Sequence, residues 1–260
     1  MTGTRVRADL EPYRVAMAEL PERAVSVAGR AGAVVVVDGT GEWWRDAEAA
    51  FHDGAAAVVV ARPSGAPAEA LDVLEARASV APIILERPLL RHDAVVAVAD
   101  ALPRTLRPGA LTVECHAPAD ALAEALRDAI GWARVLAGRP LGHRAGTLAG
   151  GSGLALLESE ARAAVSVVAA TQPGAPRLGR LRITALAETV VEVDDDGGDL
   201  VIATTDASGR RTLPRRFERP ERVALRRAVE AVRRVRRVAD LAELRHDAVL
   251  AGQILHRSRP

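Results

Sequence analysis

The sequence contains neither lysine nor asparagine, so all 35 of its basic side chains other than histidine are arginines. Without lysine there is no amine for a Schiff base and no ammonium group for proton transfer, which excludes lysine-dependent catalysis. Aromatic residues make up only 2% of the 260 residues, whereas hydrophobic residues make up 49%. The core must therefore be built mainly from alanine, valine and leucine.

Cysteine and long apolar runs are also scarce. The single cysteine, Cys115, excludes an intrachain disulfide and is compatible with a reducing compartment. No run of about 18 apolar residues is present, so the sequence predicts no membrane-spanning helix. The first 14 residues contain acids and no apolar segment, unlike a signal peptide. We therefore expect a cytoplasmic protein.

The charges of the chain are nearly balanced. A net charge of +1 gives no electrostatic argument for binding nucleic acid or an anionic membrane. In the arginine-rich segment 225–241, Leu225, Val229 and Val232 fall on one side of a helix and the arginines on the other. This pattern predicts an amphipathic helix with a solvated basic face.

The first part of the chain alternates between strand-like and helix-like segments. Four short apolar runs end in glycine, proline or charge, as expected for strands buried on both faces: 24–29, 33–39, 55–63 and 81–88. Helical patterns cover 10–20, 42–54, 66–78 and 92–102. This alternation predicts an α/β domain with a parallel sheet and crossover helices.

The second part of the chain has a different character. The segment 103–109, with two prolines and a glycine, is the best boundary and divides the chain into domains 1–106 and 107–260. A strand at 110–117 and a helix at 120–138, capped by Asp120, come next. Hairpin-spaced strands are then predicted at 143–149, 154–158, 163–171, 178–193, 199–205 and 210–217, before helical sequence from 220 to about 256.

Three motifs in this order carry a family resemblance. The run 81–85 ends in Glu86-Arg87-Pro88, the preceding run ends in Arg62-Pro63, and the helix 120–138 ends in Leu-Ala-Gly. The chain resembles the glucose–fructose oxidoreductase, inositol dehydrogenase and MocA (Gfo/Idh/MocA) family. In that family the fifth strand ends in Glu-Lys-Pro, whose lysine lies between nicotinamide and substrate. The resemblance implies a Rossmann-like NAD(P)-binding domain followed by an α+β domain with an open, mostly antiparallel sheet.

The chain departs from this family at the phosphate-binding loop. The family opens with a strand and G-x-G-x-x-G, whereas the run 24–29 is followed by only four residues, 29–32, before the next run. Four residues cannot hold a crossover, so the first βαβ unit is shortened or one of the runs is not a strand of the parallel sheet. Gly39 and Gly41 are the remaining glycine pair, with the bulky Trp44 at the third position.

The catalytic positions depart as well. Arg87 replaces the family lysine and is a poor proton donor or acceptor. Alignment on Leu-Ala-Gly puts Asp128 at the family histidine and Gly131 at its aspartate. Glu114 and His116 share one face of the strand 110–117, with Cys115 opposite. The candidate catalytic residues are Arg87, Asp128 and His116; the candidate cofactor-binding residues are Gly39, Gly41, Arg62, Pro63 and Glu86.

The sequence leaves two classes of function open. The first is a non-catalytic protein, with degraded NAD(P)-binding and catalytic motifs, that binds a small ligand or a partner. The alternative is an active NAD(P)-dependent oxidoreductase of a sugar, cyclitol or related polyol. If a ligand site survives without the cofactor, convergence of Arg62, Arg87 and Arg127 predicts a small anion.

Metal binding and assembly complete the sequence-based expectations. The six histidines show no metal-ligand spacing, and the acidic segment 194–199 is expected to be a hairpin tip. Leu181, Ile183 and Ala185 form an apolar face that the final helices cover only in part, which predicts a homodimer through the C-terminal sheet.

Overall fold

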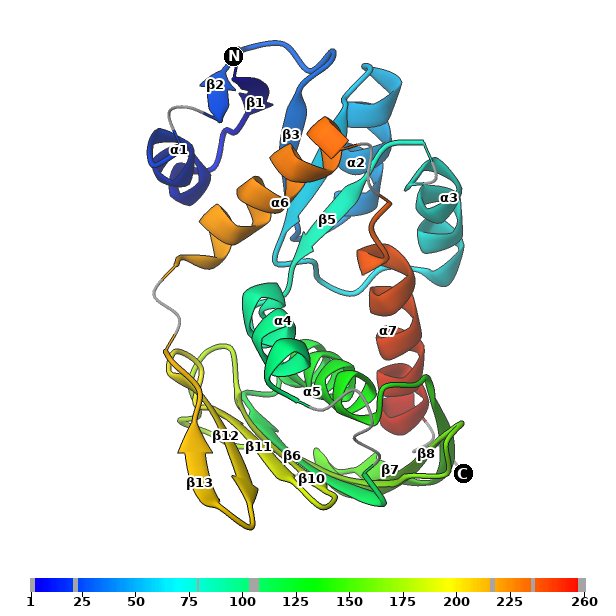
Figure 1. The fold of residues 1–260 in the computed structure, drawn as a ribbon. Helices are drawn as coiled ribbons and strands as arrows, with labels where there is room; N and C mark the ends of the chain where they lie inside the picture. The colour runs from blue at the N-terminus through cyan, green and yellow to red at the C-terminus, as the bar shows by residue number, and fades with distance from the viewer. Residues whose placement is uncertain are drawn as a thin grey trace. The chain divides into compact units, whose positions relative to one another are not determined.

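The computed structural model describes residues 3–20, 23–78, 80–102, 108–215, 218–234 and 237–256. The chain forms two compact units, and it passes between them more than once (Figure 1). Unit 1 comprises Met1–Pro88 and Phe217–Arg245, and unit 2 comprises Leu89–Arg216 and His246–Pro260. Most of the predicted boundary segment 103–109 lies outside the described residues. The division into 1–106 and 107–260 assigned α4 (His92–Ala101) to the first domain and α6 (Pro220–Arg234) to the second, whereas α4 falls in unit 2 and α6 in unit 1.

Unit 1 contains the predicted parallel sheet. Its strands are β1 (Thr4–Arg7), β2 (Ala24–Ser26), β3 (Val34–Asp38), β4 (Ala57–Ala61) and β5 (Ile83–Glu86). They are hydrogen-bonded in the order β2-β1-β3-β4-β5, and every pair is parallel. The α/β, Rossmann-like character of the N-terminal part is therefore confirmed.

Strand β1 was not predicted. Its presence explains how the runs 24–29 and 33–39 can both be parallel strands although only four residues separate them. Helix α1 (Glu11–Ala18) connects β1 to β2, while β2 and β3 both pair with β1 and not with each other. The runs 24–29 and 33–39 are therefore both strands of the parallel sheet. The four residues between them do not have to form a crossover between neighbouring strands.

Helices cover both faces of this sheet. On one face α1 and α6 (Pro220–Arg234) pack against Val6, Val34 and Ile84. On the other face α2 (Trp43–His52), α3 (Ala68–Ala78) and the start of α7 (Asp240–His256) pack against alternate residues of the same strands. This double coverage explains why the strands are unbroken valine and isoleucine runs rather than alternating ones.

Unit 2 contains the mostly antiparallel sheet that the family resemblance implied. Its strands are β6 (Ala110–Ala117), β7 (Leu141–Ala149), β8 (Ser152–Ser159), β9 (Ala164–Thr171), β10 (Arg180–Leu186), β11 (Val190–Asp195), β12 (Leu200–Asp206) and β13 (Gly209–Thr212). The order is β13-β12-β11-β10-β6-β9-β8-β7, and β6 with β9 is its parallel pair. The run 178–193, predicted as one strand segment, is two strands joined by a turn.

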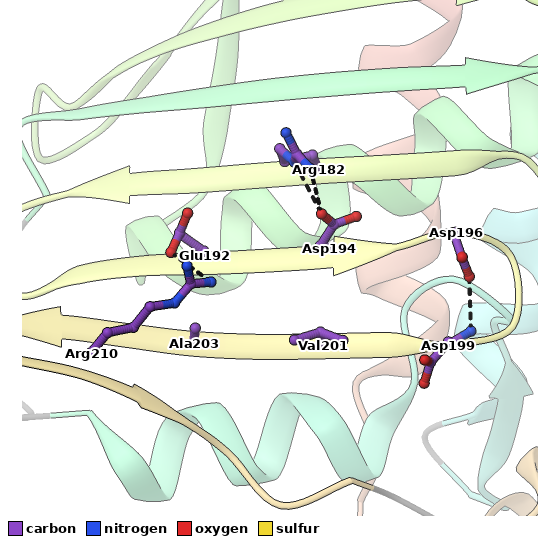
Figure 2. A pocket seen from close by; sticks show the side chains of 8 residues that line it. All are labelled: Arg182, Glu192, Asp194, Asp196, Asp199, Val201, Ala203 and Arg210. Atoms are coloured by element: carbon purple, nitrogen blue, oxygen red, sulfur yellow. Dashed lines mark hydrogen bonds and ion pairs between the residues drawn. The ribbon is translucent and has the colours of Figure 1, made fainter.

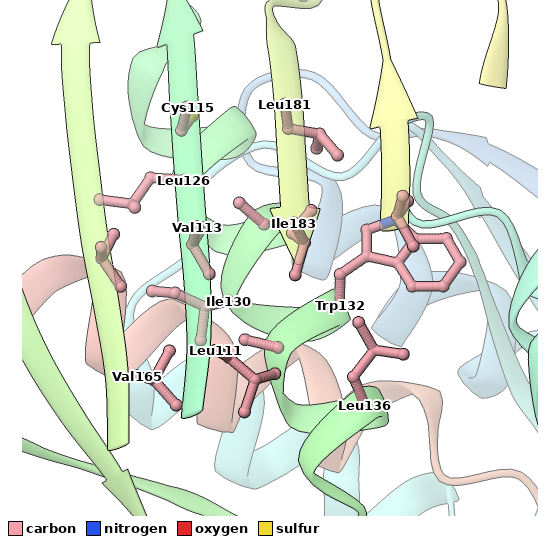
Figure 3. Packing of buried hydrophobic residues seen from close by; sticks show 14 of the residues in the cluster. Leu111, Val113, Cys115, Leu126, Ile130, Trp132, Leu136, Val165, Leu181 and Ile183 are labelled. Carbon is pink, nitrogen blue, oxygen red and sulfur yellow. The ribbon is translucent and has the colours of Figure 1, made fainter. Parts of the chain in front are cut away.

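One face of the second sheet is covered within unit 2. Helix α5 (Leu122–Ala137) lies along it, and α4 (His92–Ala101) and the end of α7 join the same core (Figure 3). Leu181, Ile183 and Ala185 are fully buried there, so the prediction of an uncovered apolar face at these residues is wrong. The predicted cap Asp120 is also wrong, because the N-cap of α5 is Ala121 and has no side-chain hydrogen bond.

Among the helices of the described ranges, none combines the length and apolarity that crossing a bilayer requires.

Candidate functional site

The carboxyl edge of the first sheet is where a doubly wound α/β unit binds its ligand. The strand order reverses direction between β1 and β3, as in the common order 2-1-3-4-5. Helix α1 follows β1 and packs on one face, whereas α2 follows β3 and packs on the other. The β1–α1 and β3–α2 loops therefore flank the switch point, and β4 and β5 end along the same edge.

The β1–α1 loop is short and acidic. It contains no glycine, and Pro12 in the first turn of α1 removes one amide from the helix N-terminus. Asp9 pairs with Arg7 at 3.3 Å, and Glu11 in the first helical turn pairs with Arg14. A pyrophosphate needs free amides and is repelled by nearby carboxylates. The residues of this loop do not fit a dinucleotide pyrophosphate.

The β3–α2 loop contains the predicted glycine pair, but its amides are used internally. The Gly39 amide donates to the Ala61 carbonyl at 2.8 Å, and the Thr40 amide donates to the Asp38 carboxylate at 3.0 Å. A Cβ on Gly39 would lie 2.2 Å from the Ala61 oxygen, so close backbone approach requires glycine there. Gly41 has a φ of +59°, which glycine adopts without strain. Close packing accounts for Gly39 and the left-handed φ for Gly41, and Asp38 adds a negative charge that does not fit a phosphate.

A buried polar cluster lies at the ends of β4 and β5. Tyr13 of α1 donates its hydroxyl to Glu86 Oε2 at 2.5 Å. Arg62 Nε lies 3.5 Å from Glu86 Oε1, and Arg62 Nη2 lies 3.7 Å from Glu221 Oε1 in the first turn of α6. Tyr13, Glu86 and Glu221 are buried, whereas the Arg62 side chain is 56% exposed. We call Tyr13, Arg62, Glu86 and Glu221 the edge cluster.

The backbone of Arg62 is held in an unfavourable conformation. Its φ is +53°, in the left-handed region that costs a residue with a Cβ about 1–2 kcal/mol. The Arg62 amide donates to the Glu86 carbonyl at 3.1 Å, which keeps the β4 end against β5. Pro63 follows directly and further restricts the Arg62 backbone. Such conformations are concentrated at ligand sites, where the surrounding structure holds them.

Burial controls the protonation of the edge cluster. Desolvation raises the pKa of Glu86, against the opposing effects of the Tyr13 hydrogen bond and the Arg62 charge, and Glu221 adds to the increase. Desolvation and the neighbouring Glu86 carboxylate raise the pKa of Tyr13, so Tyr13 remains a hydroxyl donor at neutral pH. The cluster therefore combines one exposed cation with a buried carboxylate that is unusually easy to protonate.

The predicted catalytic residues are divided between the two units, and Arg87 directly follows Glu86 at the end of β5. Arg87 is buried in unit 1. Asp128 of α5 is 1% exposed and accepts hydrogen bonds from Arg127 Nε at 3.1 Å and from the Leu89 amide at 3.4 Å. Asp128, Arg127 and Leu89 belong to unit 2, whereas Arg62 and Arg87 belong to unit 1.

His116 and Asp128 lie on opposite sides of the second sheet. His116 and Glu114 are on the face turned away from α5, and Cys115 is buried beneath α5. Burial, with a contribution from the charge of Asp128, raises the pKa of the Cys115 thiol to about 12. Asp128 is therefore on the side of Cys115, and His116 is on the opposite face of the sheet.

The outer face of the second sheet contains a separate hollow of about 390 Å³ (Figure 2). Four acids, two arginines, Val201 and Ala203 line it. Arg182 pairs with Asp194 at 2.7 Å, and Arg210 pairs with Glu192 at 3.2 Å. A ligand would have to replace these pairs. Across the described part of the chain, no group of three or more His, Cys, Asp or Glu is arranged to hold a metal ion.

Sequence reasoning missed two members of the edge cluster, Tyr13 and Glu221. Tyr13 lies 73 residues before Glu86 in the sequence, and Glu221 follows Glu86 by an even longer stretch, so no spacing rule connects them. The one available signal was composition, because Tyr13 is the only tyrosine of the sequence. A buried tyrosine usually has a hydrogen-bond partner.

Comparisons with known proteins show the fold but no sequence relationship. No protein-family model and no curated protein matches the chain. UDP-N-acetylglucosamine 3-dehydrogenase from Acidithiobacillus ferrooxidans has a TM-score of 0.73 at 15% identity, covering 98% of this chain and 97% of that chain. A 3-ketoreductase from Actinomadura kijaniata in complex with NADP has a TM-score of 0.65 at 12% identity, covering 97% of each chain.

The same ketoreductase in an open form, with TDP-benzene and NADP, gives a TM-score of 0.66 at 12% identity over 99% of this chain and 98% of that chain. The chain has their two-domain fold. A parallel sheet with Rossmann-like alternation followed by a mostly antiparallel sheet is the architecture of the Gfo/Idh/MocA enzymes. At these identities the likeness concerns the fold alone.

Proposed function

We propose that this chain is a small-anion-binding protein on the fold of the sugar oxidoreductases, and that it does not use a nicotinamide dinucleotide. The observation that carries the proposal is the half-exposed guanidinium of Arg62, held at the carboxyl edge of the first sheet by a strained backbone and two buried carboxylates. Guanidinium groups bind carboxylate and phosphate through paired hydrogen bonds.

The position of Arg62 in the sheet supports this assignment. The classical Rossmann order is 3-2-1-4-5-6, and loss of its third strand leaves the order that unit 1 has. Counted in this way, β4 takes the place of the fifth strand and β5 that of the sixth. Arg62-Pro63 then follows the strand counted as the fifth, with Ala61 in place of the glutamate of Glu-Lys-Pro, whereas the sequence resemblance matches that motif to Glu86-Arg87-Pro88.

The loops at the switch point support the exclusion of a dinucleotide. The amides of Gly39 and Thr40 are already hydrogen-bonded, and Asp9, Glu11 and Asp38 place negative charge where a pyrophosphate would lie. Each lost hydrogen bond to a charged group costs about 1.5–3 kcal/mol. Titration calorimetry of the full chain with NADH and NADPH should detect no binding tighter than about 1 mM. Micromolar affinity for either dinucleotide would overturn this part of the proposal.

The anion site is tested by thermal stabilisation. Sulfate, phosphate and UDP, added at constant ionic strength with sodium chloride as the reference, should raise the melting temperature of the wild type. Arg62→Ala should lose this increase. Arg23→Ala is the matched control, because Arg23 is a half-exposed arginine of unit 1 paired with Glu230. If no anion stabilises the wild type, or if Arg62→Ala still responds, the site is not at Arg62.

A second function is favoured by the length of the structural match. The fold likeness extends over 98% of this chain to an enzyme that oxidises UDP-N-acetylglucosamine, and the ketoreductase structures contain NADP. The alternative is therefore an NAD(P)-dependent oxidoreductase of a sugar, for which these neighbours suggest a nucleoside-diphosphate sugar. The calorimetric titrations with NADH and NADPH separate the two functions, because the alternative requires tight binding of one of these dinucleotides.

We also propose that the chain forms a homodimer through the outer face of the second sheet. Leu154 and Leu156 of β8 and Val168 of β9 are large exposed hydrophobic residues, and Leu154 lies directly opposite Val168 in the pairing of the two strands. Apolar side chains that adjoin on an open sheet face favour association. A symmetric dimer would bury the same patch of both copies.

Light scattering at tens of micromolar tests the dimer. The wild type should give twice the monomer mass, and Leu154→Arg should give the monomer mass. Val73→Arg is the control, because Val73 is similarly exposed on α3 of unit 1. A monomeric wild type would remove the proposal.

A further inference from the structure

The edge cluster has more negative than positive groups. Arg62 is its single cation, and it faces the carboxylates of Glu86 and Glu221 at 3.5 and 3.7 Å. Both distances exceed those of a close ion pair, so neither carboxylate holds the guanidinium in a bidentate grip. The guanidinium keeps donors available to solvent, as its exposure indicates.

An anion that binds at Arg62 is repelled by the carboxylates of Glu86 and Glu221. It adds a third negative group next to two carboxylates that share one guanidinium, and the burial of Glu86 weakens the screening of that repulsion. This repulsion decreases when one carboxylate takes up a proton. Glu86 is the better acceptor, because it is surrounded by the buried residues of β5, α1 and α6. Glu221 lies in the first turn of α6, where the helix dipole favours a negative charge.

Tyr13 determines which oxygen of Glu86 receives the proton. Its hydroxyl donates to Oε2 and occupies that oxygen. A proton on Glu86 therefore goes to Oε1, the oxygen that faces Arg62. A protonated carboxyl at this position becomes a hydrogen-bond donor, directed toward the region where an anion would meet the guanidinium.

We propose that one proton from solvent binds to Glu86 Oε1 when an anion binds at Arg62, so that the neutral carboxyl and the guanidinium hold the ligand together. This inference rests on the proposed function and specifies its ligand. The site would prefer an oxyanion, such as a sulfate, phosphate or carboxylate group, whose oxygens accept from both donors. Tyr13 acts as a positioning residue, because it directs the proton without contacting the anion.

The groups that face Glu86 limit what else can titrate with the anion. They are Tyr13 from α1, Arg62 from the end of β4 and Glu221 from α6. Burial already raises the pKa of Glu86, whereas Tyr13 stays a hydroxyl and Arg62 stays charged. Glu86 is therefore the buried member of the cluster to which we assign the proton.

Sulfate is the probe for the test, because its own charge does not change between about pH 5 and 8. Calorimetry of the full chain at constant ionic strength should show the dissociation constant for sulfate rising up to about tenfold per pH unit above the pKa of Glu86. Titrations in buffers with different ionisation enthalpies should show uptake of up to one proton per sulfate. The wild type should therefore bind sulfate most tightly at low pH.

Glu86→Gln keeps the shape of the side chain and removes the titration. This variant should bind sulfate with a dissociation constant that changes less than about twofold over the same pH range, and without proton uptake. Tyr13→Phe should move the pH-dependent range upward, because the lost hydrogen bond stabilised the charged form of Glu86. Glu19→Gln, a change of an exposed acid of unit 1, should behave like the wild type.

The outcomes separate this inference from the proposed function. If sulfate binds, Arg62→Ala abolishes binding, and the affinity of the wild type is independent of pH, the anion site stands and the coupling to Glu86 fails. The coupling also fails if Glu86→Gln keeps the pH dependence of the wild type. If sulfate does not bind the wild type, or Arg62→Ala binds it unchanged, the anion site itself fails and the inference with it.

Discussion

Two arginine–carboxylate contacts, one in each unit, differ in geometry. In unit 2, Arg134 of α5 forms two hydrogen bonds to Asp247 of α7, at 2.9 and 3.1 Å, and the Asp247 side chain is completely buried. In unit 1, Arg62 lies at longer distances from two carboxylates and is half exposed. One arginine is matched to one acid within a core; the other is shared between acids at an edge.

This difference indicates which arginine is free to act. A buried bidentate pair satisfies the donors that it uses and cannot release them without leaving a charge in the core. Loose contacts at a sheet edge leave donors facing water at little cost. Geometry and exposure, rather than the presence of an acid nearby, therefore distinguish a structural arginine from a ligand-binding one.

The largest expected effect comes from breaking the buried pair. Asp247→Ala should lower the free energy of unfolding by about 3–5 kcal/mol, because it leaves the Arg134 guanidinium in the core without this carboxylate. Urea denaturation measures the change. Asp194→Ala is the control, since it breaks the exposed Arg182–Asp194 pair and should cost at most about 1 kcal/mol. Equal costs for the two variants would contradict the distinction.

A buried acid without a bidentate arginine should give an intermediate effect. Asp195 in unit 2 has its pKa raised to about 6, mainly by desolvation. Because this folded-state pKa lies above the unfolded value, the associated stability is complete below the unfolded pKa and is lost as the pH rises through about 6. As the pH rises from about 4.5 to 7.5, the free energy of unfolding of Asp195→Asn should therefore increase by about 2 kcal/mol relative to that of the wild type.

Urea denaturation of the wild type and Asp195→Asn at both pH values measures this gain. The Asn side chain keeps an oxygen for the Gly197 amide, which donates to Asp195 Oδ1 at 2.9 Å, so the variant should fold. A constant difference between the two proteins across this pH range would show that Asp195 does not titrate as expected.

The smallest expected effect concerns the backbone of Arg62. Arg62→Gly should be more stable than Arg62→Ala by about 1 kcal/mol, because glycine adopts the φ of +53° without a Cβ penalty. Neither variant should approach the cost of Asp247→Ala, because the Arg62 side chain is half exposed. Thermal denaturation of both variants tests this order. The reverse order would mean that the left-handed backbone is not strained.

Much of the fold could be predicted from the sequence. The buried strands β3, β4 and β5 lie within the predicted runs, because valine and isoleucine runs covered on both faces leave a strong local signal. Strand β1 was missed because it has four residues, two of them arginine, and one buried position, Val6. Its conformation depends on pairing with β2 and β3, which are distant in sequence.

The site was less predictable than the fold. The sequence indicated the edge through Arg62, Pro63 and Glu86, since these residues directly follow buried strands. It could not indicate Tyr13 or Glu221, because helical periodicity alone did not show that their polar groups would reach the ends of β4 and β5. The strand order also determines which family strands β4 and β5 correspond to, and this order depends on β1, which was not predicted.

The return of the chain to unit 1 has a consequence for biosynthesis. Helix α6 covers the face of the first sheet that contains Val6, Val34 and Ile84, yet it is synthesised after all the strands of both sheets. While the ribosome translates residues 89–216, the part of that apolar face that α6 covers must stay exposed to solvent or chaperones. A fragment ending at Pro88 should therefore aggregate, and the protein acquires a complete first unit only after α6 has been synthesised.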